Sequence, residues 1–321
     1  MDFQFYQENI EGIELTVLQC KDGRRSSSIS IAPEYGANLC RWMVDGHAVI
    51  DFDPVVLKAR SYTGTPVLYP TPSCVRDGMF SYKGRLFRYD SASRPAYEHG
   101  LVHDQPWQFD TPRVVPHGIS MKLWIDFAKD TPQYMAFPFL HTFYLEYMLG
   151  IDGVWAHWGI RNREATEIPF GFALHPYFTK LSGEENTYVS LPATLCMEAS
   201  SDLLPTGRLI NVTGQPYDLR HPRPLKVLDL DHVFTGLDPH ASAVIEYKSL
   251  NMSIVLEAGE SMTHIVFYSP KGERYFCIEN QTCSTDAHNL YAKGFVAESG
   301  LKMVPALGTF EDFIHYIAVR G

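Results

Sequence analysis

Two short segments, about a hundred residues apart, contain the residues best suited to acid–base chemistry. Residues 171–178 place His175 in a mostly apolar run, and residues 277–290 begin with another apolar run that ends at Glu279. A buried charge is costly unless it has a partner, so such positions are either structurally satisfied or poised for proton transfer. An imidazolium and a carboxylate that face one small molecule can donate one proton while they remove another. These residues therefore predict paired proton transfer on a small ligand.

Taken singly, each of the two residues also has a purely structural interpretation. His175 is equally consistent with a core histidine at a strand end. Glu279 directly follows the strand-like residues 274–278, where a buried glutamate paired with an arginine would also fit. The aromatic ring of Tyr177 favours the functional interpretation, because aromatic faces stack on the apolar side of a sugar ring. The sequence leaves both interpretations open.

Two further polar positions are candidates for ligand binding. His99 and His103 are spaced by four, which on a helix would bring both to one metal ion, but Gly100 intervenes and the glutamate of an H-E-x-x-H motif is missing. We therefore predict no metal site, and we expect His99 either to donate to a substrate hydroxyl or to be satisfied within a loop. Asp231 lies in a more apolar setting than the other acidic pairs, which are typical of solvated faces.

Composition and charge exclude several classes of function. The 321 residues include 27 basic and 37 acidic side chains, for a net charge of −10, with no block rich in Lys or Arg. Nucleic acid and anionic membranes are therefore not expected as partners. No run approaches the roughly 20 apolar residues that span a bilayer. The chain also lacks the glycine-rich, Walker-type and G-x-S-x-G motifs of dinucleotide, nucleotide and serine-hydrolase sites.

The six cysteines are dispersed and form no C-x-x-C pair, which favours reduced thiols over a disulfide framework or a zinc site. We therefore expect a cytoplasmic protein.

The elements that must position these residues are predicted to be strands. Short runs rich in β-branched and aromatic residues, several with period-two polarity, alternate with turns containing Gly, Pro, Asn and Asp. The clearest strand-like runs are residues 14–19, 120–127, 142–149, 154–160, 252–257, 264–268 and 310–319. Helical windows are few, with one or two turns expected within 53–62 and 284–297. We predict an all-β fold, a large antiparallel β-sandwich with few short helices, in one domain over residues 1–321.

The order and spacing of several segments resemble the aldose 1-epimerase (galactose mutarotase-like) family over most of the chain. The most specific are His-Pro-Tyr-Phe at 175–178 and the block at 277–290; the weaker ones are residues 32–39, 76–84, 99–107, 160–174, 204–207, 217–220 and 231–234. The resemblance implies a site in an open groove across one sheet and cofactor-free interconversion of the α and β anomers of a free aldose. A small-molecule sugar is the expected partner, and the protein is expected to be a monomer or homodimer.

The resemblance also assigns a role to each candidate residue. Glu279, ionised, would take the proton of the anomeric hydroxyl, and His175, protonated, would give one to the ring oxygen. The ring opens to the free aldehyde, the C1 group rotates, and closure from the other face reverses both transfers. His99 would hold a sugar hydroxyl or assist at the ring oxygen, and Asp231 would accept hydroxyl protons.

One departure from the family pattern concerns the sugar-binding arginine. The family usually has an Asn-Arg pair before the hairpin at 76–84, whereas this chain has Ser73 and Cys74 there. A shift of two residues keeps the same strand face, so we expect Arg76 to replace the arginine, or else the sugar contact is lost. The glutamate block also reads Glu-Asn-Gln where Glu-Pro-Gln is commoner.

Two alternatives share the fold. A hexose-6-phosphate 1-epimerase would need clustered basic residues for the phosphate, and the only candidate cluster is Arg60, Arg76, Arg85 and Arg88. A non-catalytic sugar-binding protein would explain the missing arginine but not the presence of both His175 and Glu279.

Overall fold

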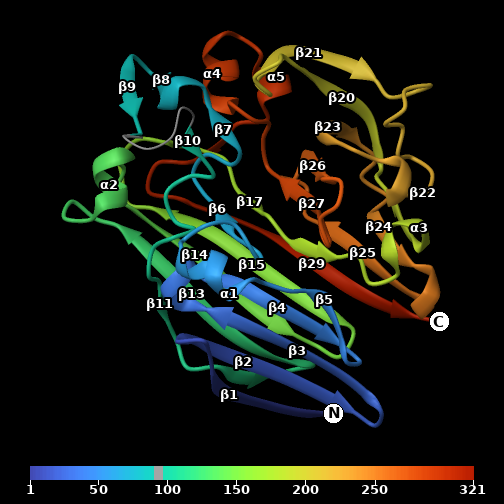
Figure 1. Ribbon diagram of the computed structural model, residues 1–321. Helices are drawn as coiled ribbons and strands as arrows, with labels where there is room; N and C mark the ends of the chain where they lie inside the picture. The colour runs from blue at the N-terminus through green and yellow to red at the C-terminus, as the bar shows by residue number, and fades with distance from the viewer. Residues whose placement is uncertain (90–96) are drawn as a thin grey trace.

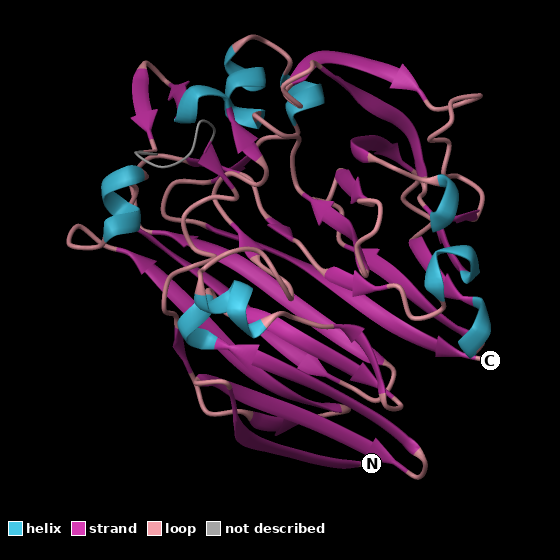
Figure 2. Ribbon diagram, in the orientation of Figure 1, coloured by secondary structure: helices cyan, strands magenta, loops and turns pink. Residues whose placement is uncertain are grey.

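Alternating polarity along the chain produces strands that bury one face. In β14 (His141–Leu149) every second residue is buried and the residues between them are half-buried, and β24 (Ala243–Tyr247) has the same alternation. Successive side chains of a strand point to opposite faces, so this pattern seals one face of a sheet against the core. The computed structural model describes residues 1–89 and 97–321, in which two large antiparallel sheets form a sandwich (Figures 1 and 2).

The first sheet contains the candidate acid–base residues. Its main path in the described chain follows the order β1-β2-β3-β4-β5-β18-β27-β26-β23-β20-β21, and β17 and β6 join it through β27. The bounds are β1 Asp2–Ile10, β2 Ile13–Asp22, β3 Arg25–Ala32, β4 Asn38–Val44, β5 His47–Ile50, β6 Val67–Leu68, β17 Ala173–Leu174, β18 Tyr177–Thr179, β20 Ala193–Ala199, β21 Pro205–Asn211, β23 Asp231–Leu237, β26 His264–Tyr268 and β27 Tyr275–Gln281.

The second sheet follows the order β11-β13-β14-β15-β29-β25-β24-β19-β22, with β12 paired to β13. Its other bounds are β11 Gln108–Phe109, β12 Arg113–Val115, β13 Gly118–Phe127, β15 Gly153–Asn162, β19 Thr187–Ser190, β22 Arg223–Pro224, β25 Met252–Ala258 and β29 Thr309–Arg320. Three small ribbons complete the described strands: β7 Cys74–Val75 with β10 Tyr97–Glu98, β8 Met79–Tyr82 with β9 Arg85–Arg88, and β16 Ile168–Phe170 with β28 Lys302–Val304.

The helices are short (Figure 2). The described α-helices are α1 Pro54–Lys58, α2 Pro132–Ala136, α3 Gly183–Asn186, α4 Ala287–Ala292 and α5 Val296–Ser299, and the 3-10 turns are η1 Pro33–Tyr35, η2 Arg76–Gly78, η3 Leu225–Val227 and η4 Lys248–Leu250. None of the helices in the described residues is long and apolar enough to cross a membrane.

Aromatic residues join the two sheets across the core. Tyr316 of β29 contacts Trp42 of β4 and Phe178 of β18, with ring centroids 6.3 and 5.8 Å apart. All three side chains are at most 1% exposed. Large buried rings contribute much of the burial free energy of a core, about 1.5–3 kcal/mol for each large apolar side chain. The sheet that contains β18 and β27 is therefore held by the other sheet from behind.

The predicted fold class is confirmed, and one boundary differs. The strand-like runs lie in β2, β13, β14, β15, β25, β26 and β29, and the two helical windows contain α1, α4 and the first half of α5. Glu279, however, is not beyond the strand end but inside β27, because ladder pairing with β26 continues from Tyr268↔Cys277 to His264↔Gln281.

Candidate functional site

Strand β27 presents Glu279 on the face of the first sheet that points away from the core. Phe276 and Ile278 belong to the apolar core, so the alternation of the strand turns Cys277, Glu279 and Gln281 to the opposite face. Glu279 is only 2% exposed despite its charge. Its Oε2 accepts a hydrogen bond from Nε2 of Gln281 at 3.1 Å.

A bend between β17 and β18 places His175 over β27. The main-chain N–H of His175 donates to the carbonyl oxygen of Pro66 at 3.0 Å, and that of Tyr177 donates to Gly64 at 2.8 Å. The Tyr177 ring stacks on the imidazole, with centroids 4.8 Å apart and planes inclined by 11°. These contacts fix the imidazole above the strand that carries Glu279.

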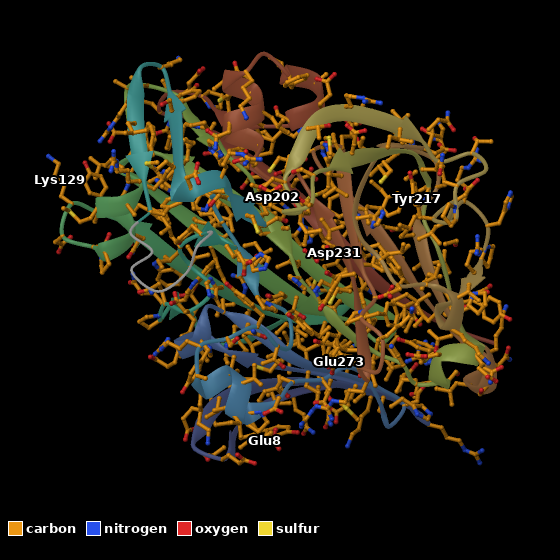
Figure 3. The ribbon with its side chains drawn as sticks, turned by 45° about the horizontal axis from the view of Figure 1, so that its top comes forward. Glu8, Lys129, Asp202, Tyr217, Asp231 and Glu273 are labelled. Carbon is orange, nitrogen blue, oxygen red and sulfur yellow. The ribbon has the colours of Figure 1, made fainter. Side chains whose placement is uncertain are left out.

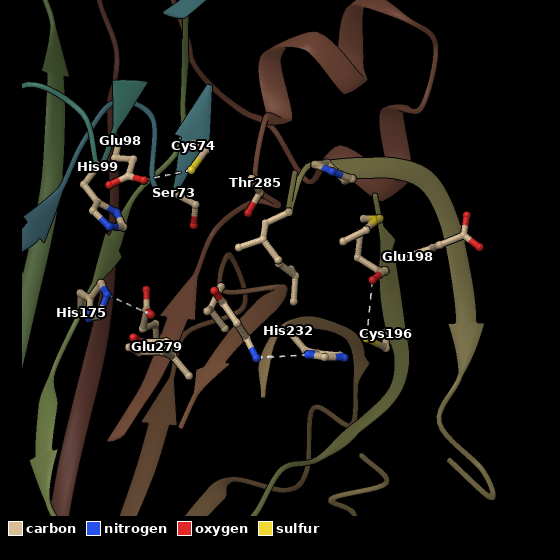
Figure 4. A pocket seen from close by; sticks show the side chains of 18 of the residues that line it. Ser73, Cys74, Glu98, His99, His175, Cys196, Glu198, His232, Glu279 and Thr285 are labelled. Atoms are coloured by element: carbon tan, nitrogen blue, oxygen red, sulfur yellow. Dashed lines mark hydrogen bonds and ion pairs between the residues drawn. The ribbon is translucent and has the colours of Figure 1, made fainter. Parts of the chain in front are cut away.

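The two predicted acid–base residues are in direct contact. Nε2 of His175 lies 3.3 Å from Oε1 of Glu279, and Figure 4 shows the contact at the wall of a cavity. Burial raises the pKa of Glu279 well above its ordinary value, and the nearby Asp231 carboxylate raises it further, while the Gln281 hydrogen bond opposes them. Burial lowers the pKa of His175 to about 4.

Both shifts disfavour an isolated charge, so the pair is most stable with one proton shared between its facing atoms. The pair then has two forms of the same net charge. One is a carboxylic acid beside a neutral imidazole, and the other is a carboxylate beside an imidazolium. Movement of one proton across the 3.3 Å contact interconverts them. The arrangement can therefore offer an acid and a base to one ligand without any change in net charge.

The pair opens into a cavity of about 580 Å³. The cavity lies over the strands of the first sheet between the β17–β18 bend and β20, and Figure 4 shows His99 and His175 on one side and His232 and Glu198 on the other. Its described lining is Tyr62, Ser73, Cys74, Glu98, His99, His175, Tyr177, Cys196, Met197, Glu198, Ala199, Ser200, Leu203, Pro205, Ile210, Tyr217, Asp231, His232, Val233, Val266, Tyr268, Glu279 and Thr285. A pyranose fits a polar and aromatic cavity of this size.

His99 reaches the cavity because the chain turns sharply at Gly100. The φ of Gly100 is +78°, and a Cβ at this position would lie 2.2 Å from the carbonyl oxygen of Tyr69. Only glycine allows so close an approach. The turn brings the His99 ring 5.3 Å from that of His175, edge to face, and 4.5 Å from Tyr62.

Asp231 lines the same cavity, two strands from Glu279. Val233 pairs with Val266, and Val266 pairs with Glu279, so these three side chains share one row and one face of the sheet. Asp231 lies two residues before Val233, on the same face in the adjacent row. Figure 3 marks Asp231 among the later strands of the first sheet. The structure thus brings His99, His175, Asp231 and Glu279 together at one cavity.

Arg76 is not among the described lining residues. The strand-face argument that would have placed it there is wrong, because β7 ends at Val75 and Arg76 begins the 3-10 turn η2. Its guanidinium instead makes an ion pair with Asp202 at 3.3 Å, and its main-chain N–H donates to Asp286 at 3.0 Å.

Sequence reasoning missed Glu98, which lines the cavity next to Cys74. The short strands β7 and β10 pair Glu98 with Cys74 in register, and Sγ of Cys74 donates to Oε1 of Glu98 at 3.6 Å. Burial first, and Glu98 second, raise the pKa of the Cys74 thiol to about 12, so it is uncharged near neutrality. Strands of two residues leave no periodic signal that would have predicted this pairing. Tyr62 and Tyr268, also missed, add aromatic rings to the lining.

No metal centre is evident in the described residues, in which no group of three or more His, Cys, Asp or Glu side chains has the arrangement to hold an ion. All six cysteines are free, and five of them are buried.

The chain is similar to known proteins over most of its length. The family model described as Aldose 1-epimerase matches residues 17–301. A galactose mutarotase-like protein from Clostridium acetobutylicum is similar over 100% of this chain and 99% of its own, with 21% identity and a TM-score of 0.86. Galactose 1-epimerase from Lactobacillus acidophilus covers 100% and 99%, with 16% identity and a TM-score of 0.77. A GalM/aldose epimerase homologue from C. elegans covers 99% of both chains, with 15% identity and a TM-score of 0.74.

Proposed function

The chain belongs to the aldose 1-epimerase family, and from that premise we propose that it interconverts the α and β anomers of a free aldose by acid–base ring opening and closure. The observation that carries the proposal is the contact between His175 Nε2 and Glu279 Oε1, 3.3 Å long, at the wall of the cavity. Anomerisation needs a base at the anomeric hydroxyl and an acid at the ring oxygen. Both oxygens are bonded to C1, so the acid and the base must lie close together.

The reaction begins from the imidazolium–carboxylate form of the pair. The sugar binds in the cavity beside the pair, so that Glu279 accepts a hydrogen bond from the hydroxyl on C1 and His175 donates one to the ring oxygen. Glu279 removes the hydroxyl proton, the electrons form the C1=O bond, the bond from C1 to the ring oxygen breaks, and that oxygen takes the proton of His175.

The open aldehyde then turns about the C1–C2 bond, and the ring hydroxyl attacks the other face of C1 as both protons return. After ring opening the pair holds a protonated Glu279 and a neutral His175, which is the other form of equal net charge described above. Burial of both side chains favours this neutral form, so the imidazolium–carboxylate form that starts the reaction is the less stable of the two. Positioning and paired proton transfer supply the acceleration.

The surrounding residues would bind the sugar hydroxyls and its apolar face. His99 and Asp231 line the cavity beside the acid–base pair and are placed to exchange hydrogen bonds with hydroxyls. Tyr177, stacked on His175, supplies an aromatic ring next to the reacting centre.

A phosphorylated sugar fits the site less well. Of the four arginines expected to form a phosphate cluster, none is among the described lining residues. Arg60 donates to the carbonyl oxygens of Glu34 and Asp104, Arg85 donates to that of Pro138, and Arg76 pairs with Asp202. A substrate without a phosphate group is therefore the better supported alternative.

Polarimetry of freshly dissolved α-glucose, α-galactose and α-xylose tests the proposal. We expect the protein to accelerate mutarotation of at least one sugar above the buffer rate, and Glu279→Gln to abolish the acceleration. Glu185→Gln is the matched control and should keep the activity, because it removes an exposed carboxylate of α3 that is not among the described lining residues. Sugar binding without acceleration would instead indicate a non-catalytic sugar-binding protein.

A further inference from the structure

The cavity contains more negative charge than the acid–base pair requires. Four carboxylates line it: Glu98, Glu198, Asp231 and Glu279. Two of them have partners that offset their charge. Glu279 contacts His175, and Glu198 makes an ion pair with Arg208 at 3.5 Å.

The other two carboxylates have no cationic partner in the described chain. Glu98 accepts a hydrogen bond from the uncharged thiol of Cys74, and it makes no ion pair with any described residue. No described side chain makes a hydrogen bond or ion pair with the carboxylate of Asp231. Glu98 raises the pKa of Asp231, behind burial as the main cause, and both carboxylates raise the pKa of Cys74, so the three groups share one electrostatic environment.

The described lining contains no Lys or Arg. His232 lowers the pKa of the adjacent Asp231, but burial lowers the pKa of His232 itself and so disfavours its cationic form. Cys74 occupies the place where an arginine was expected from the family pattern, and a thiol supplies no positive charge. His175, which lines the cavity, also has a buried nitrogen, Nδ1, without a hydrogen-bond partner in the described chain. The described lining therefore offers a ligand two carboxylates without a cationic partner and one nitrogen without a hydrogen-bond partner.

We propose that the substrate is an aldose with a protonated amine, an amino sugar, whose ammonium group lies between Glu98 and Asp231 while its anomeric carbon faces Glu279 and His175. This inference rests on the proposed function, since it names the substrate class of the same site. An ammonium group donates up to three hydrogen bonds, and carboxylates with no other cation are its natural acceptors. A neutral aldose would leave both carboxylates uncompensated, and a phosphorylated aldose would be repelled.

The amine would also assist the chemistry. The Asp231 carboxylate opposes ionisation of Glu279 by repulsion. A cation bound beside Asp231 offsets that repulsion and favours the ionised form of Glu279 that removes the anomeric proton. Binding and catalysis therefore both favour a cationic sugar over its neutral analogue.

Polarimetric kinetics with three sugars of matched ring structure test the inference: glucosamine, N-acetylglucosamine and glucose, at about pH 6.5, where an amine is protonated. We expect kcat/KM for glucosamine to exceed that for glucose by about tenfold, since two partly exposed charge pairs contribute about 0.5–1 kcal/mol each. N-acetylglucosamine, which has a neutral amide in place of the amine, should show no such preference. Added salt should reduce the preference, because it screens the charges.

Variants identify the carboxylates responsible. Glu98→Gln and Asp231→Asn should each reduce the ratio of glucosamine to glucose by about threefold, and the double variant should bring it to about one. Glu185→Gln, which makes the same change in net charge on the exposed surface, should leave the ratio unchanged. A wild-type ratio of one or less, or a preference that survives in the double variant, would overturn the inference.

The experiment separates failure of this inference from failure of the proposed function. Acceleration of glucose without preference for glucosamine contradicts only the amino-sugar assignment. If no sugar is accelerated, the proposed function fails, and calorimetric titration of the wild-type protein with glucosamine and with glucose still tests the binding claim. Tighter binding of glucosamine that weakens in the double variant supports the claim, and equal or absent binding refutes it.

Discussion

Nε2 of His175 and Oε1 of Glu279 lie 3.3 Å apart, in side chains that are 8% and 2% exposed. The pair comes from two segments separated by about a hundred residues, and the first sheet brings them together through the pairing of β18 with β27. Burial makes each charge dependent on the other, so the two groups titrate as one unit.

This coupling predicts an unusually broad pH range for activity. The pair is active with one shared proton. It gains a second proton near the lowered pKa of His175, about 4, and loses its only one at the raised pKa of Glu279. We therefore expect kcat/KM for mutarotation to fall on the acid side only near pH 4, and on the alkaline side at the raised pKa of Glu279. Polarimetric pH profiles, corrected for the buffer rate, measure both limbs. An acid-side midpoint near 6.5 would contradict this prediction, because it would show that the imidazole of His175 keeps its ordinary pKa.

Buried histidines outside the pair predict acid-labile folding. Burial lowers the pKa of His141 to about 3, and those of His264 and His288 to about 4, from 6.5. Between about pH 4 and 6.5 the unfolded chain binds three protons that the native state does not, so stability rises with pH there. The slope should approach about 4 kcal/mol per pH unit, at about 1.4 for each histidine. His175 and Glu279 add no net term, because they hold one proton in both states between about 4.5 and 6.5.

Urea unfolding at several pH values between 5 and 7.5 measures this slope. His141→Gln should reduce the slope by about a third, since His141 no longer titrates. His47→Gln, which changes an exposed histidine of β5, serves as the control. A free energy of unfolding that is constant over this range would show that these histidines are charged in the native state.

The sequence predicted the sandwich and the acid–base pair for physical reasons that have limits. Period-two polarity predicts strands because it reflects burial of one face, and residue type identifies groups that are costly to bury unless they act or pair. Long-range pairing of short strands has no such local signature. Glu98 was therefore missed, since it reaches the cavity through a pairing of two-residue strands with Cys74. Arg76 was misplaced because a 3-10 turn replaced the expected strand.

Two glycines of similar φ predict different responses to alanine. Gly100 has a φ of +78°, and a Cβ there would meet the Tyr69 carbonyl oxygen at 2.2 Å, whereas Gly84 has a φ of +76° and nothing within 4 Å. Gly84→Ala should cost about 1 kcal/mol of stability from backbone strain alone. Gly100→Ala should cost about 3 kcal/mol or more, and should raise KM for the sugar by moving His99. Urea midpoints and mutarotation kinetics of both variants compare the two effects; equal losses would mean that the close approach to Tyr69 is unimportant.

Loss of the Gln281 side chain should shift the alkaline limb of the pH–activity profile. Its Nε2 donates to Oε2 of Glu279 at 3.1 Å, and this hydrogen bond lowers the pKa of Glu279. Gln281→Leu removes the donor, so the alkaline limb should move about one pH unit higher, and kcat should fall about tenfold as Glu279 becomes harder to ionise. KM should change little, because Gln281 is not among the described lining residues. A rise in KM with an unmoved limb would assign Gln281 to sugar binding instead.

The thiol of Cys74 should react slowly with alkylating reagents although it lines the cavity. Burial, followed by the Glu98 carboxylate, raises its pKa to about 12, so very little thiolate is present at pH 8. Glu98→Gln removes a negative charge next to the sulfur and should lower that pKa by about one unit, which increases the thiolate fraction about tenfold. Iodoacetamide labelling followed by peptide mass analysis measures the rate at Cys74, with buried Cys283 as the internal reference. The rate at Cys74 should rise in the variant while that at Cys283 stays the same; an unchanged rate at Cys74 would mean that Glu98 has no electrostatic influence on this wall of the cavity.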